Sequence, residues 1–105
     1  MSPAVTSNSL TIGTDFSFGY RFLDVNRQAI ELAQWDFSAT LKSANGTLLA
    51  VPIIQICDPT TNRITLSHTI TSTLTAQAAQ LRLWGTRIED GLISQFLVAR
   101  ITISP

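Results

Sequence analysis

Apolar and polar residues alternate along several short segments of this 105-residue chain. The clearest alternation covers residues 16–22, "FSFGYRF", where every second residue is aromatic. A second segment, 35–42, alternates in the same way, with Trp35, Phe37, Ala39 and Leu41 on its apolar side. A period of two residues is that of a β-strand with one buried face. The pattern therefore predicts two half-buried strands.

A hairpin is expected directly after the second strand. Asn45-Gly46 is a strong short hairpin signal, because both residues tolerate a positive φ. The returning segment, 48–57, is apolar on both faces and contains Pro52. Because proline cannot donate a hydrogen bond to a neighbouring strand, this segment is predicted to be an edge strand, to contain a bulge, or to switch sheets.

The remaining segments predict further strands separated by turns. Residues 58–62, "DPTTN", have turn composition, and residues 69–80 lack a clean period, which indicates a short helical turn or a crossing loop. Further strands are predicted at 63–66, 80–85 and 92–104. About seven strands with short turns indicate an all-β fold, an antiparallel β-sandwich, with a small β-barrel as the alternative.

The length is that of one domain, near the commonest domain size. The chain contains neither a linker nor an internal repeat. Only its first residues have the composition of a flexible segment. We therefore expect a flexible N-terminal segment over residues 1–8 and a single domain over residues 9–105.

Charge is sparse and balanced. Charged residues make up 13% of the chain and the formal net charge is zero, whereas soluble domains usually carry about 25% charged residues. Little charge keeps copies apart, which suits a surface that is buried in an assembly. The seven basic residues are scattered singly, which argues against a nucleic-acid partner. Most are arginines, which suit protein interfaces.

The N-terminal sequence "MSPAVTSNS" has neither the basic nor the apolar region of a signal peptide. No apolar run approaches the roughly 20 residues needed to span a bilayer. We expect the chain to be made in a cytoplasm, to bind no membrane, and to stay soluble or leave only as part of a larger assembly.

The sequence offers little chemistry, since it has one histidine and one cysteine. Nucleophilic catalysis and metal binding both need several converging groups, so we expect no catalytic, metal or cofactor site and no enzyme activity. His68 is predicted to be a polar strand-end or turn residue, with a partner contact as the alternative. Cys57 is predicted to be a small apolar residue. Most carboxylates are predicted to stabilise turns: Asp24, Glu31, Asp58, Glu89 and Asp90.

Two strands near the C-terminus carry apolar residues on both faces. If Trp84, Phe96 and Val98 all point outward, they form an apolar patch that a small soluble protein normally avoids unless it binds a partner. A β-bulge that turns one of them inward is the alternative. A further alternative is that Trp84 forms a platform on which a sugar ring stacks. The candidate partner-binding residues are these three with Arg82 and Arg100.

Three segments resemble a known family in their order and spacing. They are "GTDFSFGYRFLDVNRQAIELAQWDFSATLK" (13–42), "DPTTNRITLSHTITSTLTA" (58–76) and "EDGLISQFLVARITISP" (89–105). Across residues 9–105 the chain resembles the small immunoglobulin-like domains of tailed-phage and prophage structural proteins. It is similar to the N-terminal domain of phage baseplate upper proteins.

The resemblance implies an immunoglobulin-like β-sandwich that is a non-enzymatic virion component. The expected role is a joint, cement or capsid-decoration module that binds neighbouring capsid, neck, tail or baseplate subunits in multiple copies. Because the resembling domain ends where this sequence ends, at Pro105, we expect a stand-alone module. The alternative is a carbohydrate-binding β-sandwich module for adhesion to host-surface glycans.

Overall fold

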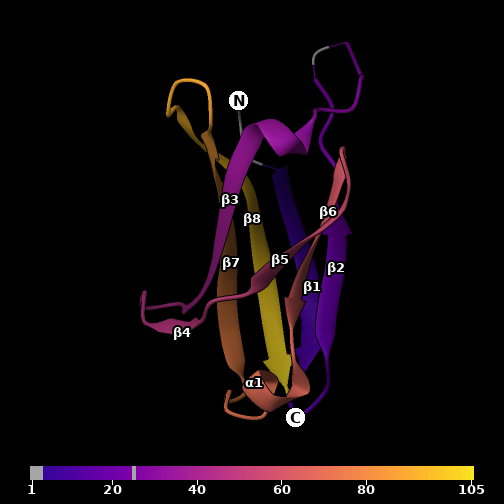
Figure 1. Cartoon of the computed structure of the whole chain (residues 1–105). Coiled ribbons are helices and arrows are strands. Elements are labelled where there is room, and N and C mark those ends of the chain that lie inside the picture. The colour runs from indigo at the N-terminus through magenta and orange to yellow at the C-terminus, as the bar shows by residue number, and fades with distance from the viewer. Residues whose placement is uncertain (1–3, 25) are drawn as a thin grey trace.

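The computed structural model describes residues 4–24 and 26–105. In these residues, eight strands form two facing sheets, and two short helical elements lie at opposite ends of the sandwich (Figure 1). The elements are β1 (Ala4–Thr11), β2 (Phe16–Tyr20), η1 (Leu32–Gln34), β3 (Trp35–Ser43), β4 (Leu48–Ala50), β5 (Ile53–Asp58), β6 (Thr61–Leu66), α1 (His68–Thr71), β7 (Gln77–Arg87) and β8 (Ile93–Ser104). Among these residues, no helix is both long and apolar enough to cross a membrane.

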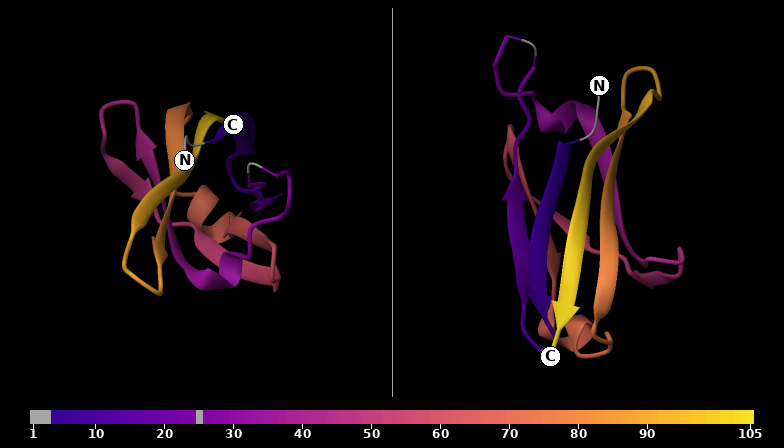
Figure 2. Two further views of the ribbon diagram at one scale, coloured as in Figure 1. Left: turned by 90° about the horizontal axis from the view of Figure 1, so that it is seen from above. Right: turned by 180° about the vertical axis from the view of Figure 1, so that it is seen from behind.

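The two sheets have the strand orders β1-β8-β7-β3-β4 and β2-β6-β5. This confirms the predicted all-β sandwich and excludes the small barrel, since the sheets do not close on each other. The order β2-β6-β5 facing β8-β7-β3 is that of strands B-E-D facing G-F-C in the immunoglobulin fold. Seen from above, the two layers are distinct (Figure 2).

The N-terminal strand corrects two details of the prediction. Residues 4–8 were expected to be flexible but belong to β1, and residues 1–3 lie outside the described residues. β1 pairs in parallel with β8, from Ala4 beside Leu97 to Thr11 beside Ser104. The strand pairing is therefore antiparallel except at this edge, and β1 is a strand that the alternation did not predict.

The predicted alternation sets the core. Phe16 and Tyr20 on β2 point inward, and so do Ala39 and Leu41 on β3. The core also contains the inward residues of β6, β7 and β8, namely Ile64, Leu66, Ala79, Leu81, Leu83, Leu97, Ala99, Ile101 and Ile103. Apart from Phe96 on β8, the buried side chains of both sheets thus follow the period of two, as expected for a sandwich.

The segment around Pro52 switches sheets, one of the three outcomes predicted for it. The Asn45-Gly46 turn, with Gly46 at φ 88°, returns β3 into β4. β4 pairs with the lower end of β3, and after Pro52 the chain crosses to the other sheet as β5. Both β4 and β5 are edge strands, so the missing N–H of the proline interrupts no ladder.

Candidate partner-binding surfaces

The outer face of the five-stranded sheet carries the first candidate surface. Arg82 on β7 lies beside Val98 on β8, and Val98 lies beside Val5 on β1. Val5 is 80% exposed, and Trp84, the next outward residue of β7, is 36% exposed. We call Val5, Trp84 and Val98 the outer-face patch; their sheet is seen from behind in Figure 2. The sequence predicted the outward positions of Trp84 and Val98 but missed Val5, because residues 1–8 had been expected to be flexible.

Two arginines flank the outer-face patch, as the alternation predicted. Arg82 and Arg100 are both exposed on the same face. Arg82 donates from Nη2 to Oε1 of Gln80 at 3.1 Å. Neither arginine has a carboxylate partner among the residues that the structure describes. Both guanidinium groups therefore remain available for hydrogen bonds to a partner.

Phe96 does not belong to this surface, which corrects the prediction for this residue. Its side chain is 1% exposed. Leu83 pairs with Leu97 but Trp84 pairs with Gln95, so the register shifts and Phe96 is the extra residue of a β-bulge. The bulge turns Phe96 inward, which is the alternative that the sequence left open.

The buried Phe96 ring is the centre of an aromatic cluster. It packs at centroid distances of 4.8 Å from Trp35, 5.1 Å from Phe37 and 5.2 Å from Phe22. The rings meet edge-on or tilted, the arrangements that aromatic quadrupoles favour. The residue that the alternation assigned to the surface thus holds the two sheets together at the η1 end of the sandwich.

A cleft of about 310 Å³ between β3 and β5 is the second candidate surface. Its apolar lining comes from η1, both strands and the β7–β8 turn, namely from Leu32, Trp35, Phe37, Ile54, Ile56 and Ile88. Ile56, on the rim, is 77% exposed. Sequence reasoning missed this cleft. The only local signal was that residues 48–57 are apolar on both faces, whereas an edge strand of a sandwich needs only one apolar face.

Asn62 of β6 also lines the cleft and is buried. Its Nδ2 donates to the hydroxyl oxygen of Tyr20 at 3.1 Å, whereas its Oδ1 has no hydrogen-bond partner. Burial raises the pKa of Tyr20 to about 12, partly offset by the hydrogen bond from Asn62. A buried acceptor without a partner costs about 1–3 kcal/mol. This group is therefore a buried acceptor without a partner in a cleft whose other polar lining residues are Asp36 and Asp58.

The turn between β7 and β8 stands above the cleft and is held by a two-pronged ion pair. Arg87 donates to Asp90 from Nε to Oδ1 at 3.0 Å and from Nη2 to Oδ2 at 2.6 Å. The Leu92 amide also donates to Asp90 Oδ1. Hydrogen bonds from Arg87, and then from Leu92, lower the pKa of Asp90 to about 2. The pair fixes a turn on which Ile88, Leu92 and Ile93 are exposed.

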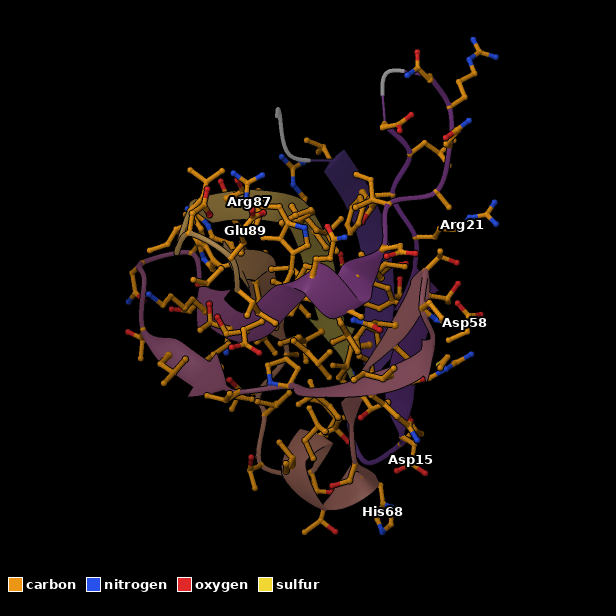
Figure 3. The ribbon with its side chains drawn as sticks, turned by 45° about the horizontal axis from the view of Figure 1, so that its top comes forward. Asp15, Arg21, Asp58, His68, Arg87 and Glu89 are labelled. Atoms are coloured by element: carbon orange, nitrogen blue, oxygen red, sulfur yellow. The ribbon has the colours of Figure 1, made fainter. Side chains whose placement is uncertain are left out.

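His68 lies at the opposite end of the sandwich from Arg87 and beside Asp15 (Figure 3). It is exposed and begins α1 where β6 ends, the position predicted for it. Asp15 Oδ1 accepts from the His68 backbone N–H at 2.6 Å and lies 3.1 Å from its Nδ1. These hydrogen bonds, the backbone one first, lower the pKa of Asp15. The pair joins α1 to the β1–β2 turn, which is a structural role.

Cys57, predicted to be a small apolar residue near the end of a strand, lies near the end of β5 with its side chain exposed. Three of the carboxylates predicted in turns do accept backbone hydrogen bonds there, namely those of Asp24, Asp58 and Asp90. Within the described residues, no three His, Cys, Asp or Glu side chains are grouped to hold a metal ion.

No family model matches the chain, and no curated protein matches it. One similar solved structure is a family 123 glycoside hydrolase from Clostridium perfringens, which acts in glycolipid glycan hydrolysis. The identity is 11% and the TM-score 0.45, with 95% of this chain and 23% of that chain covered. This chain thus spans less than a quarter of that enzyme, and the likeness carries no inference about function.

Proposed function

We propose that this protein is a non-enzymatic structural component of a tailed-phage virion, a small joint or cement that binds neighbouring subunits in multiple copies. The resemblance of residues 9–105 to immunoglobulin-like phage domains supports the virion assignment. The outer-face patch supports the binding role, because Val5, Val98 and Trp84 place apolar side chains on the same face of three adjacent strands.

The chemistry of this face supports a role as a protein interface. Tryptophan and arginine are among the interface residues whose truncation to alanine most often costs the most binding energy. Here Trp84 pairs with two polar neighbours, Ser38 on β3 and Gln95 on β8. The apolar pair of Val98 and Val5 lies beside Arg82, the preceding outward residue of β7. Two arginines without carboxylate partners in the described residues, Arg82 and Arg100, border the apolar residues. An apolar centre with a polar and charged rim is the usual arrangement of such surfaces.

Co-sedimentation with virions tests the proposal, together with size-exclusion chromatography and light scattering of the isolated chain. We expect the chain to sediment with the particles, and Trp84→Ala to reduce that association by about tenfold or more. Thr86→Ala is the matched control, since Thr86 is exposed on the same face of β7. A monomer that never co-purifies with virions would contradict the proposal.

A carbohydrate-binding module is the second candidate, supported by the partial exposure of Trp84 on the outer face of the five-stranded sheet. Aromatic rings at such positions stack on sugars. A glycan array separates the two functions. Glycan binding by the wild-type chain that is lost in Trp84→Ala would favour the second candidate. Glycan binding unchanged in Trp84→Ala would remove its basis, and no glycan binding at all would leave the protein–protein role.

A further inference from the structure

We infer that residues Trp35–Thr40 of β3 are a docking edge for an extended strand of a partner protein, one of whose apolar side chains enters the neighbouring cleft. This inference rests on the proposed binding role and adds to it a second surface, separate from the outer-face patch. It also states the chemistry of the partner.

The first observation is a free strand edge. β4 is three residues long and pairs with β3 only at Leu41 and Lys42. Along Trp35–Thr40, β3 pairs with β7 on one side, and the described residues supply no strand on the other. At about 3.3 Å per residue, these six residues offer roughly 20 Å of edge. That length suits a strand that continues β4 toward η1.

Two hydrogen bonds show which main-chain groups point to the free edge. Ser43 donates its N–H to Thr47 O across the β3–β4 hairpin, whereas Gln34 O accepts from Ile88 N–H on the β7 side. Main-chain groups alternate in direction along a strand. The odd-numbered residues Phe37 and Ala39 therefore direct their N–H and C=O groups to the free edge, where a partner strand would bond them.

The second observation is the apolar cleft beside this edge. Phe37 forms one wall, and Ile54 and Ile56 of β5 form the other. The β7–β8 turn adds a further exposed apolar side chain to this cleft, that of Ile88. An added strand would bury part of this surface, because every second side chain of it would face inward between the sheets.

The third observation is the unpartnered Oδ1 of Asn62, which is 3% exposed. Its Nδ2 is turned toward Tyr20 on β2, so Oδ1, the other branch of the amide, is turned toward β5 and the cleft that Asn62 lines. A donor brought in by the bound segment, or by a water that it encloses, would satisfy this acceptor.

The chemistry of the edge specifies the occupant. Trp35, Phe37 and Ala39 face inward, and Asp36 and Ser38 face outward. A matching strand therefore alternates apolar and polar residues. It carries a basic residue opposite Asp36, which has no cationic partner among the described residues.

A second copy fits this edge less well. Antiparallel pairing of two such edges about Phe37 would place Leu41 of one copy beside Ala33 of the other, since both lie four residues from the centre. The β4 strand next to Leu41 would then meet η1, which contains Ala33. A separate protein with an unobstructed strand avoids this conflict.

Amide hydrogen exchange measured by NMR on the full chain tests the inference. The probe is a short capped peptide in which valine alternates with threonine and lysine. We expect it to slow exchange at Phe37 and Ala39 by about tenfold or more, with little change at Asp36 and Ser38, whose amides already bond to β7. The same peptide with glutamate in place of lysine is expected to protect these amides less.

Ile56→Ser is expected to weaken the peptide effect. Ile93→Ser is expected to leave it unchanged, because Ile93 is 65% exposed on β8 and does not line the cleft. No protection at Phe37 and Ala39, or protection along β1 or β2 instead, would overturn the inference. Protection that rises with protein concentration without peptide would overturn it in favour of a second copy. If Trp84→Ala impairs virion association but peptide leaves Phe37 and Ala39 unprotected, the proposed function stands and only this inference fails.

Discussion

Gly85 on β7 leaves the space that the ring of Phe96 on β8 fills. A Cβ placed on Gly85 would lie 2.7 Å from Cε2 of Phe96, closer than real Cβ contacts allow. It would also lie 3.1 Å from Cε1 of Phe37. The bulge that turns Phe96 inward therefore depends on a residue without a side chain on the neighbouring strand.

Gly85→Ala is expected to lower the free energy of unfolding by about 1–3 kcal/mol, because overpacking forces the rings of Phe96 and Phe37 to shift. This exceeds the gain of about 0.4–1 kcal/mol that alanine brings by restricting the unfolded chain. Urea denaturation measures the change. Gly19→Ala is the control, since its Cβ would meet the Asn62 backbone oxygen at an ordinary 3.6 Å. Equal stability of the two variants would contradict the packing account.

Phe96→Ala is expected to cost about 3–5 kcal/mol of stability, because it empties the centre of the aromatic cluster. Ile93→Ala on the same strand is expected to change stability by no more than about 0.5 kcal/mol, since Ile93 is largely exposed. Chemical denaturation of both variants compares them. A small loss of stability in Phe96→Ala would indicate that Phe96 is exposed, as the alternation alone predicts.

The β7–β8 turn is expected to loosen in acid. Because the pKa of Asp90 is lowered to about 2 from an ordinary 3.8, the ionised carboxylate stabilises the fold above pH 3.8, and this stabilisation is lost as the pH falls toward 2. A carboxyl-resolved NMR titration reports the pKa directly. Asp90→Asn should speed amide exchange at Leu92, with Glu89→Gln as the control. A pKa near 3.8 would show that the Arg87–Asp90 pair does not form in solution.

Alkaline conditions are expected to destabilise the core at Tyr20. Its pKa is raised from 10.0 to about 12, so the folded chain holds this proton more tightly than the unfolded chain. The stabilisation is complete below pH 10 and is lost as the pH rises through 12. Tyr20 is the only tyrosine in the sequence, so phenolate absorbance reports it alone. Tyr20→Phe should remove this pH dependence, and titration near pH 10 would contradict the buried environment.

Apart from β1, which the sequence did not predict, the strands and turns of this protein are determined locally, so the sequence predicts them. The alternation over 16–22 and 35–42 makes one face of each segment apolar, and only the extended backbone brings such residues to one side. Asn45-Gly46 and Pro52 constrain φ and hydrogen bonding by their own covalent structure. That is why the hairpin and the sheet switch could be anticipated.

The functional surfaces required the tertiary structure, because they depend on which residues lie opposite one another. Phe96 has an outward position by alternation and is turned inward only because its bulge faces Gly85. Val5 joins the outer-face patch only through the parallel pairing of β1 with β8. The cleft exists because β4 stops short along β3, a length that its apolar sequence does not reveal. Periodicity assigns a side chain to a face, but strand register and the space across the sheet decide whether that face is filled.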